Sequence, residues 1–144
     1  MIVSIHMPKT AGMTFGELLG RAFQKRLMLD YEDHAAFRSP EALAQCAANA
    51  AGMRARRDEL IAAYDVIHGH FVADKYAGLF PDGRFIAFFR DPYHQAISHY
   101  RFLQRTTHLP HPVVGAFHDA KMTPAEFICW EATKNPQTML LGRV

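Results

Sequence analysis

The chain has 144 residues, 49% of them hydrophobic and 21% charged, a balance typical of one soluble globular domain and not of a disordered or fibrous chain. Its formal net charge of +2 argues against nucleic-acid binding, so any anion site must be local. We expect a single domain over residues 1–144. Cys46 and Cys129 form no C-x-x-C pair, and no apolar run reaches the roughly 18 residues of a membrane helix, so we expect reduced thiols, no membrane span and a cytoplasmic location.

The first predicted unit is a strand, a loop and a helix. Ile2–His6 is a short run rich in β-branched residues, and apolar residues recur at helical spacing over Phe15–Phe23. Thr14 and Glu17 match the capping-box pattern. The helix is therefore expected to begin at the end of the loop Met7–Met13, which then faces a helix N-terminus.

The middle of the chain predicts two helices and a second strand. Ser39 followed by Pro40 suits a cap and a first helical position, opening an alanine-rich helix that Gly52 is expected to interrupt. A second helical stretch should run to about Tyr64. The compact apolar pair Val66-Ile67 then predicts a buried strand.

The strongest strand signal lies in Arg84–Arg90, where the apolar run Phe85–Phe89 favours a strand buried on both faces. Asp91-Pro92 provides a cap and a first-turn proline for the next helix. Residues 106–121 form a loop rich in His and Pro, and Thr123 opens a final helix with a second capping-box pattern.

Helices interleaved with short buried strands predict an α/β fold, a three-layer sandwich with a central parallel sheet covered on both faces. Ligands bind such sheets beyond the carboxyl ends of the strands. Three strand ends lead into polar residues, and we expect these three edges to share one crevice. The edges are His6 into Pro8-Lys9-Thr10, Ile67 into His68-Gly69-His70, and Phe89 into Arg90-Asp91-Pro92.

Two of these edges have the chemistry of an anion site. The first combines helix-start amides, threonine hydroxyls and Lys9, and it is not a Walker A loop because its lysine precedes the glycine. The third offers the guanidinium of Arg90 and, two turns into the next helix, the hydroxyl of Ser98. An ordinary strand-to-helix turn and an arginine paired to the adjacent aspartate are the alternative interpretations.

Three motifs in this order resemble the PAPS-dependent sulfotransferases, where PAPS is 3′-phosphoadenosine 5′-phosphosulfate, and in particular the heparan sulfate 2-O- and related carbohydrate sulfotransferases. Pro8-Lys9-Thr10-Ala11-Gly12-Met13-Thr14 resembles the 5′-phosphosulfate loop, and Arg90-Asp91-Pro92 through Ser98-His99-Tyr100 resembles the 3′-phosphate motif. His68-Gly69-His70 resembles the strand-end motif whose second histidine is the catalytic base. Asn135-Pro136-Gln137 with Leu140-Leu141-Gly142 resembles a later segment near the acceptor or cofactor pocket.

The resemblance implies a P-loop-kinase-like sheet, PAPS as donor, and a hydroxyl-bearing small molecule or saccharide as acceptor. In this mechanism Lys9 stabilises the charge that grows on the leaving phosphate and His70 accepts the proton of the attacking hydroxyl. His68 is the reserve base, expected to be structural because strand alternation should point it to the opposite face. The implied donor-binding positions are Lys9, Thr10, Ala11, Gly12, Met13, Thr14, Arg90 and Ser98.

The chain departs from the family's pattern in two places. Met13 stands where relatives commonly carry a hydroxyl residue, and relatives usually continue past Val144, which leaves open that the sequence is a fragment. We expect no metal, because His108, His111 and His118 fit no common zinc spacing.

Two other functions stay open. A small nucleotide kinase would need a Gly-Lys-Ser/Thr loop and an acidic strand end for magnesium, and the sequence offers neither clearly. A non-catalytic domain for binding adenosine phosphates or for assembly would bind the nucleotide without transferring any group. The sequence determines neither the acceptor nor the oligomeric state.

Overall fold

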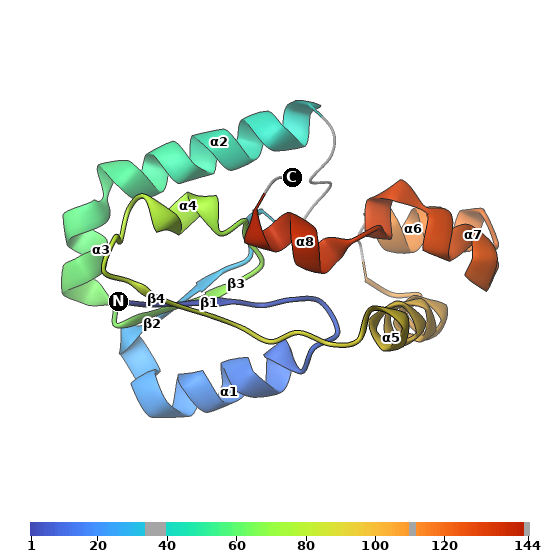
Figure 1. Ribbon diagram of the computed structural model, residues 1–144, viewed down its shortest axis with the longest axis horizontal. Coiled ribbons are helices and arrows are strands. Elements are labelled where there is room, and N and C mark those ends of the chain that lie inside the picture. Colours follow the sequence, from blue (N-terminus) through green and yellow to red (C-terminus); the bar gives the residue numbers. More distant parts are fainter. Residues whose placement is uncertain (34–39, 110–111, 143–144) are drawn as a thin grey trace.

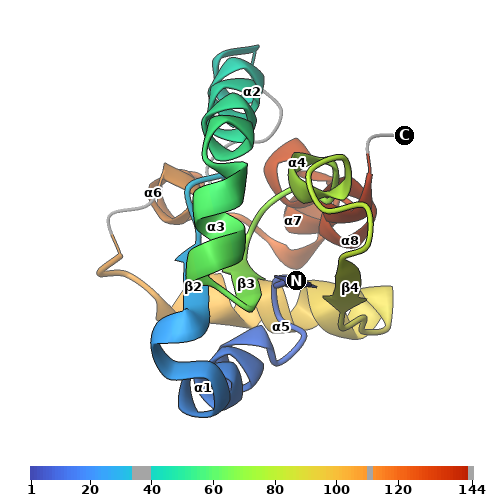
Figure 2. The same cartoon turned by 90° about the vertical axis from the view of Figure 1, so that its left-hand side faces the viewer.

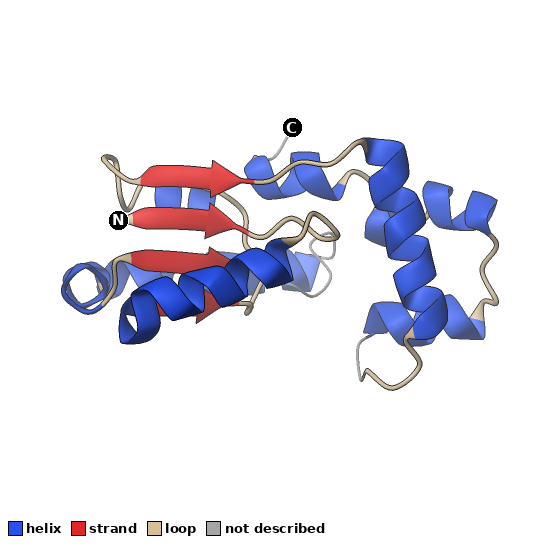
Figure 3. Ribbon diagram, turned by 90° about the horizontal axis from the view of Figure 1, so that it is seen from below, coloured by secondary structure: helices blue, strands red, loops and turns tan. Residues whose placement is uncertain are grey.

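The computed structural model describes residues 1–33, 40–109 and 112–142. All strands run in the same direction, so their carboxyl ends lie at one edge of the sheet (Figure 3). This confirms the predicted α/β fold with a central parallel sheet. The sheet has the order β2-β3-β1-β4 and consists of β1 (Ile2–Ile5), β2 (Leu27–Asp30), β3 (Val66–Gly69) and β4 (Arg84–Ala87).

Helices cover both faces of the sheet (Figures 1 and 2). On one face lies α1 (Gly12–Phe23), which the short 3₁₀ turn η1 (Gln24–Arg26) joins to β2. On the other face lie α2 (Pro40–Ala55), α3 (Arg57–Ala63) and α4 (Asp74–Ala77). The main core lies between the sheet and this second layer, and it includes Val3, Ile5, Leu60, Ile67, Phe71 and Tyr76.

This arrangement creates a switch point between two neighbouring strands. The strand β1 is followed by α1 on one face, whereas its neighbour β3 is followed by α4 on the other face (Figure 1). The two connections therefore diverge at the carboxyl ends of β1 and β3. Open parallel sheets bind ligands at such a point.

The C-terminal helices gather beyond the carboxyl ends of the strands (Figure 3). A second apolar cluster of Leu103, Val114, Phe117 and Phe127 holds α5 (Pro92–Arg105), α6 (Pro112–Asp119) and α7 (Pro124–Cys129) together. After the 3₁₀ turn η2 (Glu131–Thr133), α8 (Pro136–Leu141) returns to the sheet layer. There Leu140 joins the main core, and its carbonyl accepts a 2.7 Å hydrogen bond from the amide of Ala73.

Several local predictions are confirmed. The Asp91 side chain caps α5 by accepting a 3.0 Å hydrogen bond from the amide of His94. The capping box of Thr123 and Glu126 forms at the start of α7. The helix α3 ends one residue before Tyr64, and β3 begins at Val66.

Two helix predictions are wrong. The helix α1 begins at Gly12, so Thr14 and Glu17 lie inside it and form no capping box; its N-cap position is Ala11, which has no side-chain cap. Gly52 does not interrupt α2, which continues to Ala55. A single glycine costs a helix only about 1 kcal/mol, and the packing of the buried Met53 against the core offsets that cost.

Three further predictions need correction. The strand β4 ends at Ala87 and lies at an edge of the sheet, so it is not buried on both faces: Phe85 is 40% and Phe89 is 58% exposed. Residues 106–121 are not a continuous loop, because they contain α6. Sequence patterns also missed β2, α4 and α8. The predicted cap Ser39 lies outside the described residues.

None of the helices within the described ranges is long and apolar enough to cross a membrane.

Candidate functional site

The loop between β1 and α1 adopts a strained backbone. Lys9 and Ala11 have φ angles of 65° and 66°, in the left-handed region that residues with a Cβ rarely occupy. Two hydrogen bonds hold the loop in this shape. The hydroxyl of Thr10 donates to a carbonyl of its own loop at 2.9 Å, and the side chain of Gln95 donates to the carbonyl of Pro8 at 2.8 Å. Strain of this kind persists only where the surroundings fix it, and it concentrates at functional sites.

The loop ends in a helix N-terminus without a side-chain cap, at the carboxyl end of β1. No side chain caps α1, and its first regular hydrogen bond runs from the Phe15 amide to the Ala11 carbonyl at 3.0 Å. Met13 is 75% exposed and Thr14 is also exposed, so this end of the helix is open to solvent. Amides in a first helical turn suit anionic oxygens.

Glycines let α1 lie directly on two histidines. A Cβ at Gly12 would lie 1.8 Å from Cδ2 of His6, and a Cβ at Gly16 would lie 2.9 Å from Nε2 of His68. Any side chain at Gly12 would push the helix start away from the sheet. The glycine of the loop motif therefore sets the distance between the helix N-terminus and the histidines below it.

Three histidines form one stacked group at the carboxyl ends of β1 and β3. The ring of His6 stacks with that of His68 at a centroid distance of 5.3 Å and with that of His70 at 4.2 Å. His68 lies in β3 and stacks on the same His6 ring as His70, so the expectation that it points to the opposite face from His70 is wrong. The ring of His68 is covered by α1 at Gly16.

Burial separates the two candidate bases. His68 is only 1% exposed; its Nδ1 lies 2.9 Å from the hydroxyl of Ser4, and its Nε2 has no hydrogen-bond partner of good geometry. Burial lowers the pKa of His68, which keeps the ring neutral. A substrate hydroxyl cannot reach this ring without displacing α1. His68 is therefore an interior residue, whereas His70 is only half-buried.

One hydrogen bond defines the tautomer of His70. Its Nδ1 makes a short hydrogen bond with the backbone carbonyl of His6. Because a carbonyl can only accept, Nδ1 carries a proton, and in the neutral ring Nε2 then carries the lone pair. This is the tautomer that a general base requires, with its acceptor nitrogen on the side of the ring away from β1.

A group of cations lies beside the loop. The ammonium of Lys9 lies 4.2 Å from the ring centre of Phe102 in α5. The pKa of Lys9 is lowered by burial and by the like charges of Arg105 and Arg90. The Arg90 guanidinium reaches the same loop and donates to the carbonyl of Lys9 at 3.3 Å. Three positive charges thus converge, and a bound anion would relieve their repulsion.

One face of α5 lies against the loop. Gln95 donates to Pro8 from this face, and Phe102 lies under Lys9. Ser98 is three residues after Gln95 and four before Phe102, so helical periodicity places it on the same face. The structure thereby brings the predicted serine to the side of the helix that faces Lys9.

The C-terminal segment reaches the site through Gln137. Its side-chain amide pairs with the backbone of Arg90 in both directions, accepting from the amide at 2.9 Å and donating to the carbonyl at 2.9 Å. This double hydrogen bond fixes the strand end that carries the guanidinium. The segment predicted to lie near the cofactor or acceptor pocket therefore supports Arg90.

Not every predicted donor-binding side chain offers its polar group to the crevice. The hydroxyl of Thr10 is committed inside the loop, and Thr10 is buried. Ala11 and Gly12 contribute backbone only. Of the loop histidines, His118 bonds the carbonyls of Leu103 and Thr106, and His111 lies outside the described residues. Within the described ranges, no group of three His, Cys, Asp or Glu side chains could hold a metal ion.

Sequence reasoning missed three residues of the site. Arg105 lies on the α5 face of Ser98, and its seven-residue spacing from Ser98 was a signal that could have revealed it. His6 was treated only as the end of a strand. Tyr31 follows β2, which was not predicted, and its hydroxyl lies 2.9 Å from Nδ1 of His6.

Comparisons with protein-family models, with curated proteins and with solved structures give no match to this chain.

Proposed function

We propose that this chain is a sulfotransferase that moves a sulfuryl group from PAPS to a hydroxyl acceptor, in particular a carbohydrate. The observation that carries the proposal is the meeting of three strand ends in one place: a strained loop with an uncapped helix start, the cations Lys9 and Arg90, and a histidine whose Nε2 holds a lone pair. The motif resemblance supplies the identity of the donor.

We assign different groups of the donor PAPS to different residues of the candidate site. The first-turn amides of α1 and the ammonium of Lys9 would bind the 5′-phosphosulfate, since both favour negative charge. Arg90 and Ser98 would bind the 3′-phosphate. Burial is the main cause of the lowered pKa of Lys9, and the like charges of Arg105 and Arg90 lower it further. The nearness of these like charges supports an anion site.

In the proposed reaction, the acceptor oxygen attacks sulfur in line with the leaving phosphate oxygen. The new S–O bond forms as the bond between sulfur and the phosphate oxygen breaks, and the acceptor proton passes to Nε2 of His70. The leaving phosphate gains negative charge, which Lys9 and the loop amides stabilise. The flexible stem of Lys9 allows its ammonium to move from the Phe102 ring to this phosphate.

Binding is tested by calorimetry with 3′,5′-bisphosphorylated adenosine, compared with AMP and with ATP plus magnesium. The bisphosphate should bind most tightly. Arg90→Ala should weaken it by roughly 1.5–3 kcal/mol, because a charged hydrogen-bond partner of the 3′-phosphate is lost. Arg54→Ala, on the exposed surface of α2, is the matched control and should leave the affinity unchanged. Equal affinity of Arg90→Ala and the parent would contradict the assignment.

Transfer is tested with PAPS and a panel of hydroxyl acceptors. His70→Ala should lower turnover by about 10²- to 10⁴-fold while the bisphosphate affinity stays constant, because the histidine acts on the acceptor and not on the donor. Unchanged turnover would remove His70 from the role of base. A preference for ATP with magnesium would select a kinase, and bisphosphate binding without transfer to any acceptor would select a non-catalytic domain.

A further inference from the structure

Tyr31 is the first residue after β2, and it enters the histidine group from the side. Its hydroxyl lies 2.9 Å from Nδ1 of His6. Its ring meets the ring of His70 edge-on, at a centroid distance of 5.0 Å and an interplanar angle of 86°. The ring of His70 is thus held on one side by the stacked His6, at 4.2 Å, and on another by Tyr31.

The contacts of Tyr31 bear on the tautomer of His70. The carbonyl that accepts from Nδ1 of His70 belongs to His6, the same residue whose side chain Tyr31 binds. Burial, and the repulsion that a proton on His6 would meet from Lys9 and from protonated His70 or His68, lower the pKa of His6 to about 3, so its ring stays neutral. Burial raises the pKa of Tyr31, which stays a phenol. The pair therefore supports His70 without adding a charge beside it.

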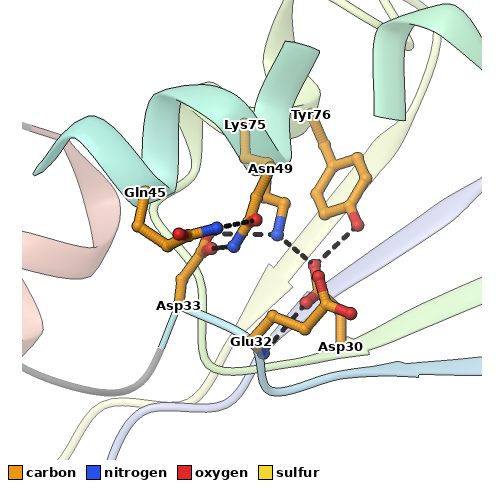
Figure 4. Close-up of polar contacts among 7 residues, drawn as sticks. All are labelled: Asp30, Glu32, Asp33, Gln45, Asn49, Lys75 and Tyr76. Carbon is orange, nitrogen blue, oxygen red and sulfur yellow. Dashed lines mark hydrogen bonds and ion pairs between the residues drawn. The ribbon is translucent and has the colours of Figure 1, made fainter. Parts of the chain in front are cut away.

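A buried ionic network fixes the chain on both sides of Tyr31 (Figure 4). The ammonium of Lys75 lies 2.8 Å from Asp30 and 3.1 Å from Asp33, and all three side chains are almost fully buried. The hydroxyl of Tyr76 donates to Asp30 at 2.7 Å, and Asn49 donates to Asp33 at 2.8 Å. The two carboxylates that flank Tyr31 in sequence are thereby tied to α4 and α2.

The burial of Lys75, Asp30 and Asp33 has a large free-energy cost. Buried charges bring a desolvation penalty that their attraction barely offsets, so the network is weak evidence for stability alone. What it does fix is backbone position, because it anchors the residue before Tyr31 and the second residue after it. The turn cannot shift without breaking buried ion pairs, so the Tyr31 hydroxyl stays directed at His6.

We propose that Tyr31 is a positioning residue, which acts through His6 to hold His70 in the tautomer with its lone pair on Nε2. The role of this tautomer in turnover rests on the proposed function. The hydrogen bond to His6 and the edge contact to His70 are the contacts through which Tyr31 acts.

The test compares Tyr31→Phe, which removes only the hydroxyl, with Tyr64→Phe at the end of α3 as a matched control. Two-bond ¹⁵N–¹H spectra of histidine-labelled protein report the tautomer of each imidazole, and His6→Gln and His70→Gln assign the signals. The parent should show His70 protonated on Nδ1. The spectrum of Tyr31→Phe should show both tautomers of His70, whereas the spectrum of Tyr64→Phe should be the same as that of the parent.

Steady-state kinetics give the second readout. Tyr31→Phe should lower kcat by about 10- to 100-fold, the effect of a misplaced catalytic group, with the KM for the donor within about twofold of the parent. Melting curves verify that the variant is folded. Unchanged ¹⁵N signals of His70, or an unchanged kcat in an active parent, overturn the proposal. If the parent transfers no sulfuryl group, the proposed function fails and the spectra alone decide the role of Tyr31.

Discussion

Acid should destabilise this protein through His6. The ring is 7% exposed, and its pKa is lowered from 6.5 to about 3 by burial and by the charges of His70, His68 and Lys9. Between these two values the unfolded chain binds a proton that the folded chain does not bind. The free energy of unfolding must therefore fall as the pH falls below about 6.5, and the loss continues towards the pKa of the folded state.

The size of this effect follows from the two pKa values. Going from pH 7 to pH 5, the unfolded state gains about 2 kcal/mol from protonation of this one residue, because 1 pH unit is worth 1.36 kcal/mol once the group titrates fully. The result depends little on the folded pKa, provided that this value lies well below 5.

Urea unfolding of the parent and of His6→Gln at both pH values measures the effect. The parent should lose about 2 kcal/mol more than His6→Gln on acidification. His108→Gln, which replaces an exposed histidine, should lose as much as the parent. Equal pH dependence of His6→Gln and the parent would contradict the lowered pKa of His6, and with it the conclusion that burial keeps this ring neutral.

Two further predictions concern packing. Lys75→Met should lower the free energy of unfolding by about 3–5 kcal/mol, because it leaves the buried carboxylates of Asp30 and Asp33 without their cation. Lys134→Met, which removes an exposed ion pair with Glu131, should change this free energy by less than about 1 kcal/mol in the same urea titration. Gly12→Ala should lower the free energy of unfolding by about 1–3 kcal/mol, since its Cβ would lie 1.8 Å from the His6 ring. Gly115→Ala, with open space around it, should leave the free energy of unfolding unchanged or raise it. A loss at Gly12 no larger than that at Gly115 would contradict the close contact with His6.

The sequence predicted those parts of the fold that have strong local signals. Asp91 and Thr123 are helix caps because side-chain oxygens bind first-turn amides, and these interactions need no tertiary context. The convergence of Lys9, His70 and Arg90 was also predictable, since parallel strands end at one edge of a sheet. The sequence alone thus indicated where the candidate site lies.

The missed elements depend on contacts distant in sequence. Leu27–Asp30 has no β-branched residue, so its sequence gives no strong strand signal. It forms β2 because it pairs in parallel with β3, and the two strands end at the same level of the sheet. Pro112 looked like a loop residue, but it begins α6, which the second apolar cluster stabilises. The roles of Tyr31 and His6 follow from β2 and could not be derived before that strand was known.

The carboxylates Asp91 and Asp30 do not neutralise the cations Lys9 and Arg90. The sequence allowed Arg90 to be neutralised by its neighbour Asp91, but the carboxylate of Asp91 instead caps α5 and lies 3.4 Å from Nδ1 of His94. Among the described residues Arg90 makes no ion pair with Asp91, and its guanidinium donates to the Lys9 carbonyl. Asp30, at the end of β2, is buried against Lys75. These two carboxylates thus have partners other than Arg90, which is compatible with the proposed binding of an external anion by Lys9 and Arg90.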